Sequence, residues 1–177
     1  MNFRSVKTAF GHRFKVPERI QRIDSDSTHG WQLRYGRMPT EFFSDATRNR
    51  AGAAASLEHA VAALHKRVRR LPAPTGLKTE VAGWKKSGLP VGISGPRAHR
   101  RADKKVAYYS FLVSVPLASG GSTTRQVYIG TQNTMNDQRF DEALAKAVLL
   151  RDAAVESYTQ TKTRAKRRAA AAVQRAA

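Results

Sequence analysis

The sequence contains no cysteine, which excludes disulfide bonds and cysteine-ligated zinc and fits a reducing intracellular compartment. It also lacks any apolar run near the roughly 18 residues that a membrane span needs, so we expect no membrane partner. Acidic residues are scarce, because 13 Asp and Glu stand against 32 Lys and Arg, for a formal net charge of +19. This imbalance predicts attraction to polyanions, of which nucleic acid is the commonest.

Recognisable catalytic patterns are also missing. Five histidines are scattered along the chain, and no two have the spacing of a metal-ligand pair: His12, His29, His59, His65 and His99. No cluster of carboxylates or nuclease-like motif accompanies them. We therefore expect a protein that is not an enzyme and that uses no metal or cofactor.

The length of 177 residues suits one ordinary domain or two small ones, and 41% hydrophobic residues supply a modest core. Changes in composition predict five segments: a basic arm over 1–16, a first periodic segment over 17–71, a linker over 72–92, a second periodic segment over 93–158 and a basic, alanine-rich tail over 159–177. The tail has strong helix propensity, and we expect either a solvated helical extension or disorder there.

The second periodic segment predicts strands followed by a helix. "VAYYSFLVSVP" alternates, with Tyr109, Phe111, Val113 and Val115 on one face and Tyr108, Ser110, Leu112 and Ser114 on the other. "RQVYIG" predicts the next strand, with Gln126 and Tyr128 pointing outward. "FDEALAKAVLL" has apolar residues three and four apart, which predicts a helix capped by Thr134, Asn136 or Asp137. A short first strand near Ile93 completes the sheet.

The first periodic segment has the same order of elements. "EFFSDATRN" aligns with "VYIGTQNTM", and "SLEHAVAAL", with Ser56 as the expected helix cap, aligns with "FDEALAKAV". We interpret this order as an internal duplication. The predicted fold class is α+β, with two small modules that each pack a three-stranded antiparallel sheet on one C-terminal helix, and with basic terminal arms.

A sheet backed by a helix on one side leaves its other face free for the DNA major groove. Arg can read guanine, Gln can read adenine, and Lys mostly contacts phosphate. The candidate DNA-binding residues are Arg97, Arg100, Arg101, Lys104, Lys105, Ser110, Ser114, Gln126 and Tyr128 in the second module, and Arg22, Gln32, Arg34 and Arg37 in the first. The alternative interpretation is a set of solvated side chains that only keep the sheets from aggregating.

The stretch "VYIGTQNTMNDQRFDEALAKAVLLRD" at 127–152 resembles the third strand and helix of an AP2/ERF-type DNA-binding domain. "SGPR" at 94–97 resembles the start of that family's first strand, and "THGWQLRYGRMPTEFFSD" at 28–45 resembles the diverged modules of bacterial and phage proteins. The resemblance implies a sheet in the major groove, with Arg97 as a base-contacting residue. It places Gln126 and Tyr128 where the family usually has Arg and Trp.

These observations predict a double-stranded DNA-binding protein, either a transcriptional regulator or a nucleoid or architectural protein. It would act in the bacterial nucleoid, or in the host cytoplasm if a phage encodes it. Two alternatives stay open: an RNA-binding or ribosome-associated protein, and a phage or mobile-element protein that targets a host nucleoprotein complex. The sequence defines neither an oligomeric state nor a target sequence.

Overall fold

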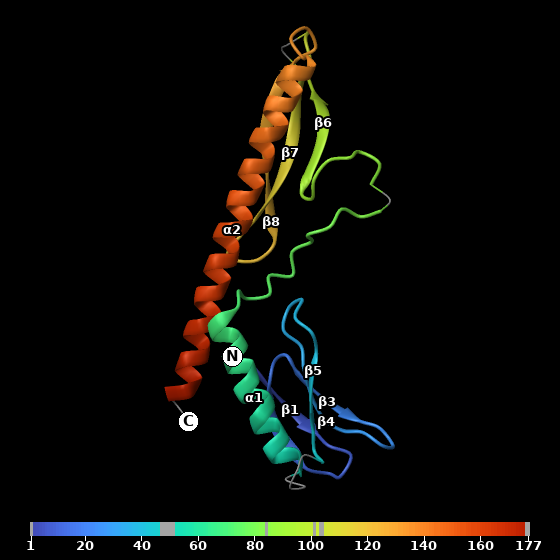
Figure 1. Ribbon diagram of the computed structural model, residues 1–177. Coiled ribbons are helices and arrows are strands. Elements are labelled where there is room, and N and C mark those ends of the chain that lie inside the picture. The colour runs from blue at the N-terminus through green and yellow to red at the C-terminus, as the bar shows by residue number, and fades with distance from the viewer. Residues whose placement is uncertain (1, 47–51, 84, 101, 103–104, 176–177) are drawn as a thin grey trace. The chain divides into compact units, whose positions relative to one another are not determined.

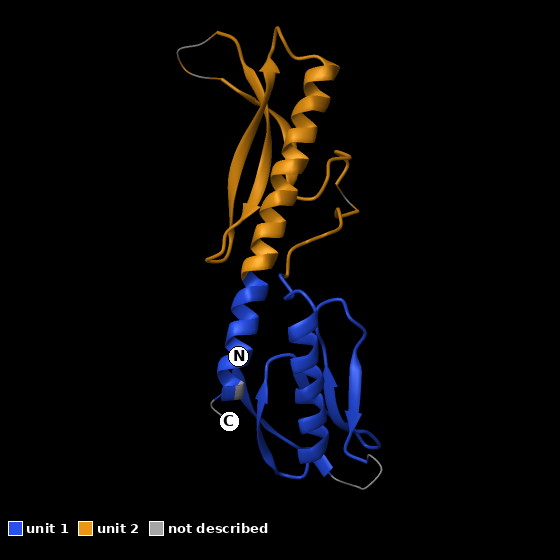
Figure 2. Cartoon of the chain, turned by 60° about the vertical axis from the view of Figure 1, so that its left-hand side comes forward, with its two compact units in different colours: residues 1–75, 162–177 blue, residues 76–161 orange. Residues whose placement is uncertain are grey.

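The computed structural model describes residues 2–46, 52–83, 85–100, 102 and 105–175. Within them the chain is an α+β protein with three small antiparallel sheets and two helices (Figure 1). It divides into two compact units, residues 1–75 with 162–177 as unit 1 and residues 76–161 as unit 2 (Figure 2). The boundary after residue 75 falls inside the segment expected to be a linker.

The N-terminal residues form a hairpin, so the expectation of a basic arm over 1–16 is wrong. β1 (Phe3–Lys7) pairs antiparallel with β2 (Arg13–Pro17). In β2 the exposed cations Arg13 and Lys15 alternate with the half-buried Phe14 and the fully buried Val16. Burying one apolar face stabilises a strand even when the strand has a net positive charge. The alternation in β2 therefore favours a hairpin over a free basic arm.

The predicted first module has its expected order of elements. β3 (Ile20–Asp24), β4 (His29–Leu33) and β5 (Glu41–Ser44) form one antiparallel sheet, and α1 (Gly52–Arg70) follows. The core joins the sheet to the predicted apolar stripe of the helix through Ile20, Trp31, Leu33, Leu57, Ala60, Leu64 and Val68. Ser56 is not the helix cap that we expected, because α1 begins four residues earlier, at Gly52.

The second module is a longer version of this arrangement. β6 (Ile93–His99), β7 (Tyr108–Pro116) and β8 (Ser122–Thr131) form an antiparallel sheet, and α2 (Asp137–Arg175) follows. Asn136 caps α2, as predicted, because its Oδ1 accepts a hydrogen bond of 2.9 Å from the backbone N–H of Arg139. Two bulges interrupt the pairing, one between Ser94 and Arg97 and one between Tyr109 and Ser110.

The C-terminal tail is part of α2 and contributes to unit 1. Ala170 is buried in the unit 1 core, and Thr163 Oγ1 accepts a hydrogen bond of 2.9 Å from the backbone N–H of Ala73. Over its described residues, 159–175, the tail is the expected helix, but it is not fully solvated, because Ala170 packs in the unit 1 core. The expected linker over 72–92 is also partly packed, with Ala73 buried in unit 1 and Leu89 in unit 2.

Candidate nucleic-acid interface

The two faces of the β6–β7–β8 sheet have different surroundings. Phe111 and Val113 are fully buried beneath α2, and the Phe111 ring meets Phe140 edge to face at 5.1 Å. Ala143 and Ala147 of α2 complete this core, and α2 runs along the sheet in Figure 1. Because alternate residues of a strand point to opposite faces, their neighbours project from the side opposite α2, which we call the open face.

Two rows of paired residues cross the open face. Arg97 on β6 pairs with Ser110 on β7, which pairs with Tyr128 on β8. Leu112 pairs with Gln126 in the next row. Arg97 and Gln126 are exposed, and 54% of Tyr128 is accessible to solvent. The outward direction predicted for Gln126 and Tyr128 is therefore confirmed.

Ser110 lies on the predicted face but is buried, so its prediction as an exposed contact residue is wrong. Only 1% of Ser110 is accessible, because its neighbours in the sheet cover its short side chain. A hydrogen bond of 3.0 Å joins Ser110 Oγ to His99 Nε2 across the strands. Ser110 thus positions His99 and has no surface to offer a ligand. Ser114, on the same face, is half-buried, and its backbone carbonyl accepts a hydrogen bond from the Arg151 guanidinium.

An aromatic row on the open face escaped the sequence reasoning. His99 stacks on Tyr108 with ring centroids 5.0 Å apart and an interplanar angle of 19°. Tyr108 in turn lies 6.3 Å from Tyr128, with the rings tilted by 39°. The alternation of "VAYYSFLVSVP" places Tyr108 outward, on the same face as Tyr128, and this pattern could have indicated the pair of tyrosines. The apposition of His99 depends on a bulged register that no local pattern reveals.

The predicted basic cluster is only partly described. Arg97 is in β6, and Arg100 and Lys105 are exposed in the connection between β6 and β7. Arg101 and Lys104 lie outside the described residues. The described cations therefore border the aromatic row.

The predicted residues of unit 1 fall into two groups. Gln32 is half-buried on β4, and its Oε1 accepts a hydrogen bond of 2.9 Å from Arg34 Nε. Arg34 is exposed directly after β4, and Arg37 is exposed in the turn that follows. These three lie at or beyond the end of β4, whereas Arg22 lies elsewhere.

Arg22 is a structural residue, so its prediction as a DNA contact is wrong. Its guanidinium donates hydrogen bonds to both oxygens of Asp45, at 2.6 and 3.0 Å, and to Asp24 at 2.9 Å. Its side chain is only 5% exposed and lies over the Trp31 ring at 5.0 Å. The physical reason is its position, because Arg22 pairs directly with Trp31 and so points to the buried face.

The same network sets the charge state of two carboxyl groups. The hydrogen bond from Arg22 holds the pKa of Asp24 well below its usual range, against the effect of burial. Burial opposes ionisation of Asp45, but hydrogen bonds from Arg22 and Ser56 outweigh it and lower the pKa of Asp45. Ser56 Oγ donates to Asp45 Oδ1 at 2.7 Å, which ties α1 to the end of β5. Both acids are therefore ionised partners of Arg22 at neutral pH.

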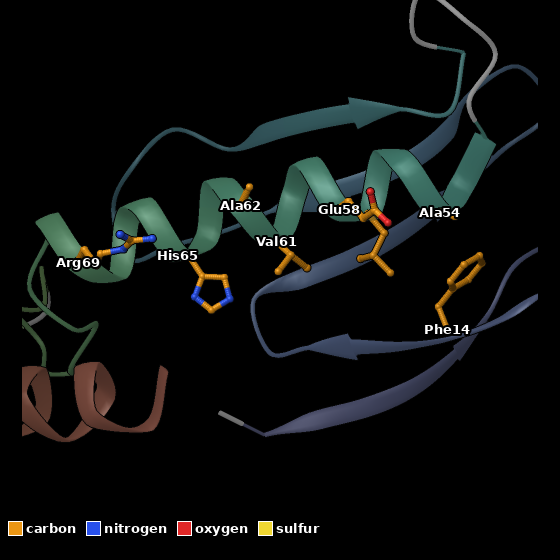
Figure 3. Close-up of a pocket in the computed structure, with 8 residues that line it drawn as sticks. Phe14, Ala54, Glu58, Val61, Ala62, His65 and Arg69 are labelled. Carbon is orange, nitrogen blue, oxygen red and sulfur yellow. The ribbon is translucent and has the colours of Figure 1, made fainter. Parts of the chain in front are cut away.

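Unit 1 also has an apolar groove of about 570 Å³ between α1 and Phe14 of the hairpin (Figure 3). Leu57 and Val61 line it together with Glu58, His65 and Arg69. Burial lowers the pKa of His65, and Arg69 adds to this effect.

Among the described residues, no group of three or more His, Cys, Asp or Glu side chains is arranged to hold a metal ion. No helix in the described part of the chain is long and apolar enough to cross a membrane.

Comparisons with protein-family models, curated proteins and solved structures found no match for this chain. The resemblance to AP2/ERF-type domains therefore stays a prediction from the sequence. Any statement on function rests on the open face and its surroundings.

Proposed function

We propose that the protein binds double-stranded DNA, with the open face of the β6–β7–β8 sheet turned toward the major groove. The observation that carries this proposal is the projection of Arg97, Gln126 and Tyr128 from one exposed sheet face, in adjacent rows. A guanidinium and an amide are the groups that read guanine and adenine edges. A two- or three-stranded β-ribbon fits the width of the major groove.

The spacing of these side chains also suits duplex DNA. Gln126 and Tyr128 are two residues apart on β8, so their Cα atoms lie roughly 7 Å apart. That separation is close to two base-pair steps of about 3.4 Å each. Side chains from neighbouring rows can therefore contact successive parts of one site without bending the sheet.

Charge supports the same partner. The net charge of +19 attracts phosphate from any direction. Arg100 and Lys105 are exposed in the connection after β6, next to the open face. This placement favours backbone contacts that orient the sheet, while the residues of the two rows face the bases. The AP2/ERF resemblance agrees with this division of roles.

The proposal is tested by selecting binders from a mixed pool of duplexes at several salt concentrations and sequencing the bound fraction. An enriched motif that persists at high salt, and that is lost in Arg97→Ala, identifies a sequence-specific regulator. Tight binding with no motif and a steep salt dependence identifies an architectural protein that contacts phosphates. Absence of duplex binding even at low salt contradicts the proposal.

Lys146→Ala is the matched control for Arg97→Ala. Lys146 is exposed on α2, between the buried Ala143 and Ala147, and so belongs to the other side of unit 2. Both substitutions remove one positive charge. If the two variants lose affinity equally, the open face has no special role and only net charge matters.

A second candidate function is the binding of single-stranded RNA. The aromatic row of His99, Tyr108 and Tyr128 on a sheet surface favours it, since unpaired bases stack on such rings. Competition between a duplex and an unstructured RNA of equal length separates the two candidates. Preference for RNA, with a larger loss in Tyr128→Ala than in Arg97→Ala, would replace the duplex proposal.

A further inference from the structure

Unit 1 has a cationic site of its own. A hollow of about 450 Å³ is lined by Arg4 of β1, Arg19 and Ile20 at the start of β3, Gln21, Arg34 and Glu18. We call it the arginine hollow. Its lining includes three arginines and one glutamate, and all three arginines are exposed. The hollow therefore has a positive charge and open access.

Two of the three arginines are held in place by hydrogen bonds that leave most of their donors available. Arg4 Nη2 donates to the backbone carbonyl of Ile20 at 3.0 Å, and Arg34 Nε donates to Gln32 Oε1 at 2.9 Å. A guanidinium has five N–H donors, so each keeps most of them for a ligand. Arg19 has no side-chain hydrogen bond or ion pair with any described residue. Two pre-positioned arginines and a third whose donors are all unused suit the oxygens of a phosphate.

The carboxylate in the arginine hollow has other partners. Glu18 Oε1 accepts a hydrogen bond of 2.7 Å from Asn2 Nδ2, and its Oε2 lies 3.9 Å from Lys166 Nζ. Lys166 adds a further positive group beside the site. Burial lowers the pKa of Lys166, Glu18 opposes that effect, and the positive charge of Arg19 adds to it. Glu18 therefore balances Lys166, and the three arginines keep their excess charge.

The backbone of Arg19 is a separate sign of a functional position. Among the described residues, Arg19 is the one non-glycine residue with a positive φ, at 80°. Its carbonyl accepts a hydrogen bond of 2.8 Å from the backbone N–H of Arg34, which extends the β3–β4 pairing by one residue pair beyond Ile20 and Leu33. Glycine adopts this conformation without penalty, and arginine does not. Strained positions of this kind cluster at ligand sites.

We propose that Arg4, Arg19 and Arg34 bind one phosphate group, supplied by the backbone of the nucleic acid. The site adjoins Gln21 and Gln32, which pair directly on β3 and β4 and so share one face of the unit 1 sheet. A phosphate held in the arginine hollow fixes the strand next to these two amides. The source of the phosphate rests on the proposed function, but the phosphate site itself does not.

The test uses the full chain and two probes, inorganic phosphate and a duplex, at constant ionic strength set with chloride. Phosphate is expected to raise the melting temperature and to shift the side-chain N–H resonances of Arg4, Arg19 and Arg34. Arg19→Gly removes the guanidinium and relieves the backbone. It is expected to keep or raise the melting temperature without ligand while weakening binding of both probes about tenfold, the effect of losing a charge-assisted hydrogen-bond pair.

Two further variants make the test specific. Arg13→Ala removes an equal charge from the same hairpin, outside the arginine hollow, and is expected to change phosphate affinity little. Arg19→Lys keeps the charge but loses the planar fork, and is expected to bind phosphate more weakly than the wild type. Equal losses in Arg13→Ala and Arg19→Gly would overturn the proposal, as would binding of phosphate no better than chloride.

The outcomes also separate this proposal from the proposed function. If phosphate binds through Arg19 but no duplex does, the phosphate site stands, its ligand is a small phosphorylated molecule, and the DNA function fails. If the duplex binds and Arg19→Gly leaves both affinities unchanged, the DNA function stands and the phosphate site fails.

Discussion

The β3–β4–β5 sheet and the β6–β7–β8 sheet share one strand order, and each is followed by a helix, yet their first-strand arginines have opposite surroundings. Arg22 pairs with the core residue Trp31 and points toward the buried face, where two aspartates bind it. Arg97 pairs with Ser110 and Tyr128 on the open face. The face to which a strand residue points, and not its charge, separates a structural arginine from a candidate ligand-binding one.

The two units also differ in where their acidic residues lie. In unit 1, Asp24 and Asp45 bind Arg22, and Glu41 accepts a hydrogen bond of 2.8 Å from Arg67. The two rows of the open face in unit 2 contain Ser94, Leu112 and Gln126, and Arg97, Ser110 and Tyr128, with no carboxylate. Among the described residues of these two rows, the charge of Arg97 has no carboxylate beside it in the sheet, which favours contact with phosphate.

The largest expected difference between the two arginines is in the stability that each contributes to the fold. Arg22→Ala leaves the half-buried carboxylates of Asp24 and Asp45 without the guanidinium that they share, so we expect the free energy of unfolding to fall by about 2 kcal/mol. Arg97→Ala removes an exposed side chain and should cost less than about 0.5 kcal/mol. Urea denaturation followed by circular dichroism measures both. Similar losses in the two variants would show that the arginines do not differ in role.

Acid should weaken unit 1 through the same network. The folded-state pKa values of Asp24 and Asp45 are lowered, so their contribution is present above the unfolded-state pKa of about 3.8 and is lost as pH falls below it. Trp31 fluorescence in a Trp84→Phe background reports unfolding of unit 1 against pH. Asp24→Asn, which removes one titrating group, is the control and should show a smaller dependence on acid. An unchanged acid dependence in that variant would contradict this assignment.

Sequence periodicity predicted the strands and helices well. It did not predict which side chains, distant in the sequence, contact one another. Outward Gln126 and Tyr128 followed from the period of two along β8, which holds from the start of the strand to the bulge after Tyr128. Arg22 is two residues from the buried Ile20, and this spacing was the signal for its buried direction. Its aspartate partner at 45 is distant in sequence, so the ion pair itself left no local pattern.

Other features were hidden for physical reasons. The basic arm was predicted from composition, which obscured the alternation of Phe14 and Val16 in β2. Ser110 is buried between Arg97 and Tyr128, and this pairing follows from a register with two bulges that no local pattern reveals. The arginine hollow joins residues from β1, the β2–β3 turn and the end of β4, and only the folded chain brings them together.

Each of the two sheets has an exposed aromatic residue, and we expect their substitutions to have smaller and different effects. Tyr128 on β8 is 54% exposed, and Phe42 on β5 is 41% exposed. Tyr128→Ala should weaken duplex binding by about 1 kcal/mol, the size of one lost hydrogen bond from its hydroxyl group. Phe42 covers Gly30, where an added Cβ would lie 2.6 Å from its ring, so Phe42→Ala should lower stability and weaken duplex binding less than Tyr128→Ala does. Fluorescence anisotropy with a labelled duplex and urea denaturation measure the two effects, and a reversal of this pattern would contradict the assignment of the open face.

The smallest expected effect concerns the buried serine of the open face. Ser110→Ala removes the hydrogen bond to His99 Nε2, and should cost about 1 kcal/mol of stability or less. Because His99 stacks on Tyr108, the aromatic row should also become less ordered, and affinity for nucleic acid should fall a few-fold without loss of any surface contact. Ser114→Ala is the matched control, since Ser114 lies on the same strand and face but has no side-chain hydrogen bond to a described residue. Relaxation measurements on the His99 and Tyr108 ring resonances test the order directly. If Ser110→Ala leaves the rings as rigid as in the wild type while affinity falls, Ser110 contacts the ligand itself and its burial is relieved on binding.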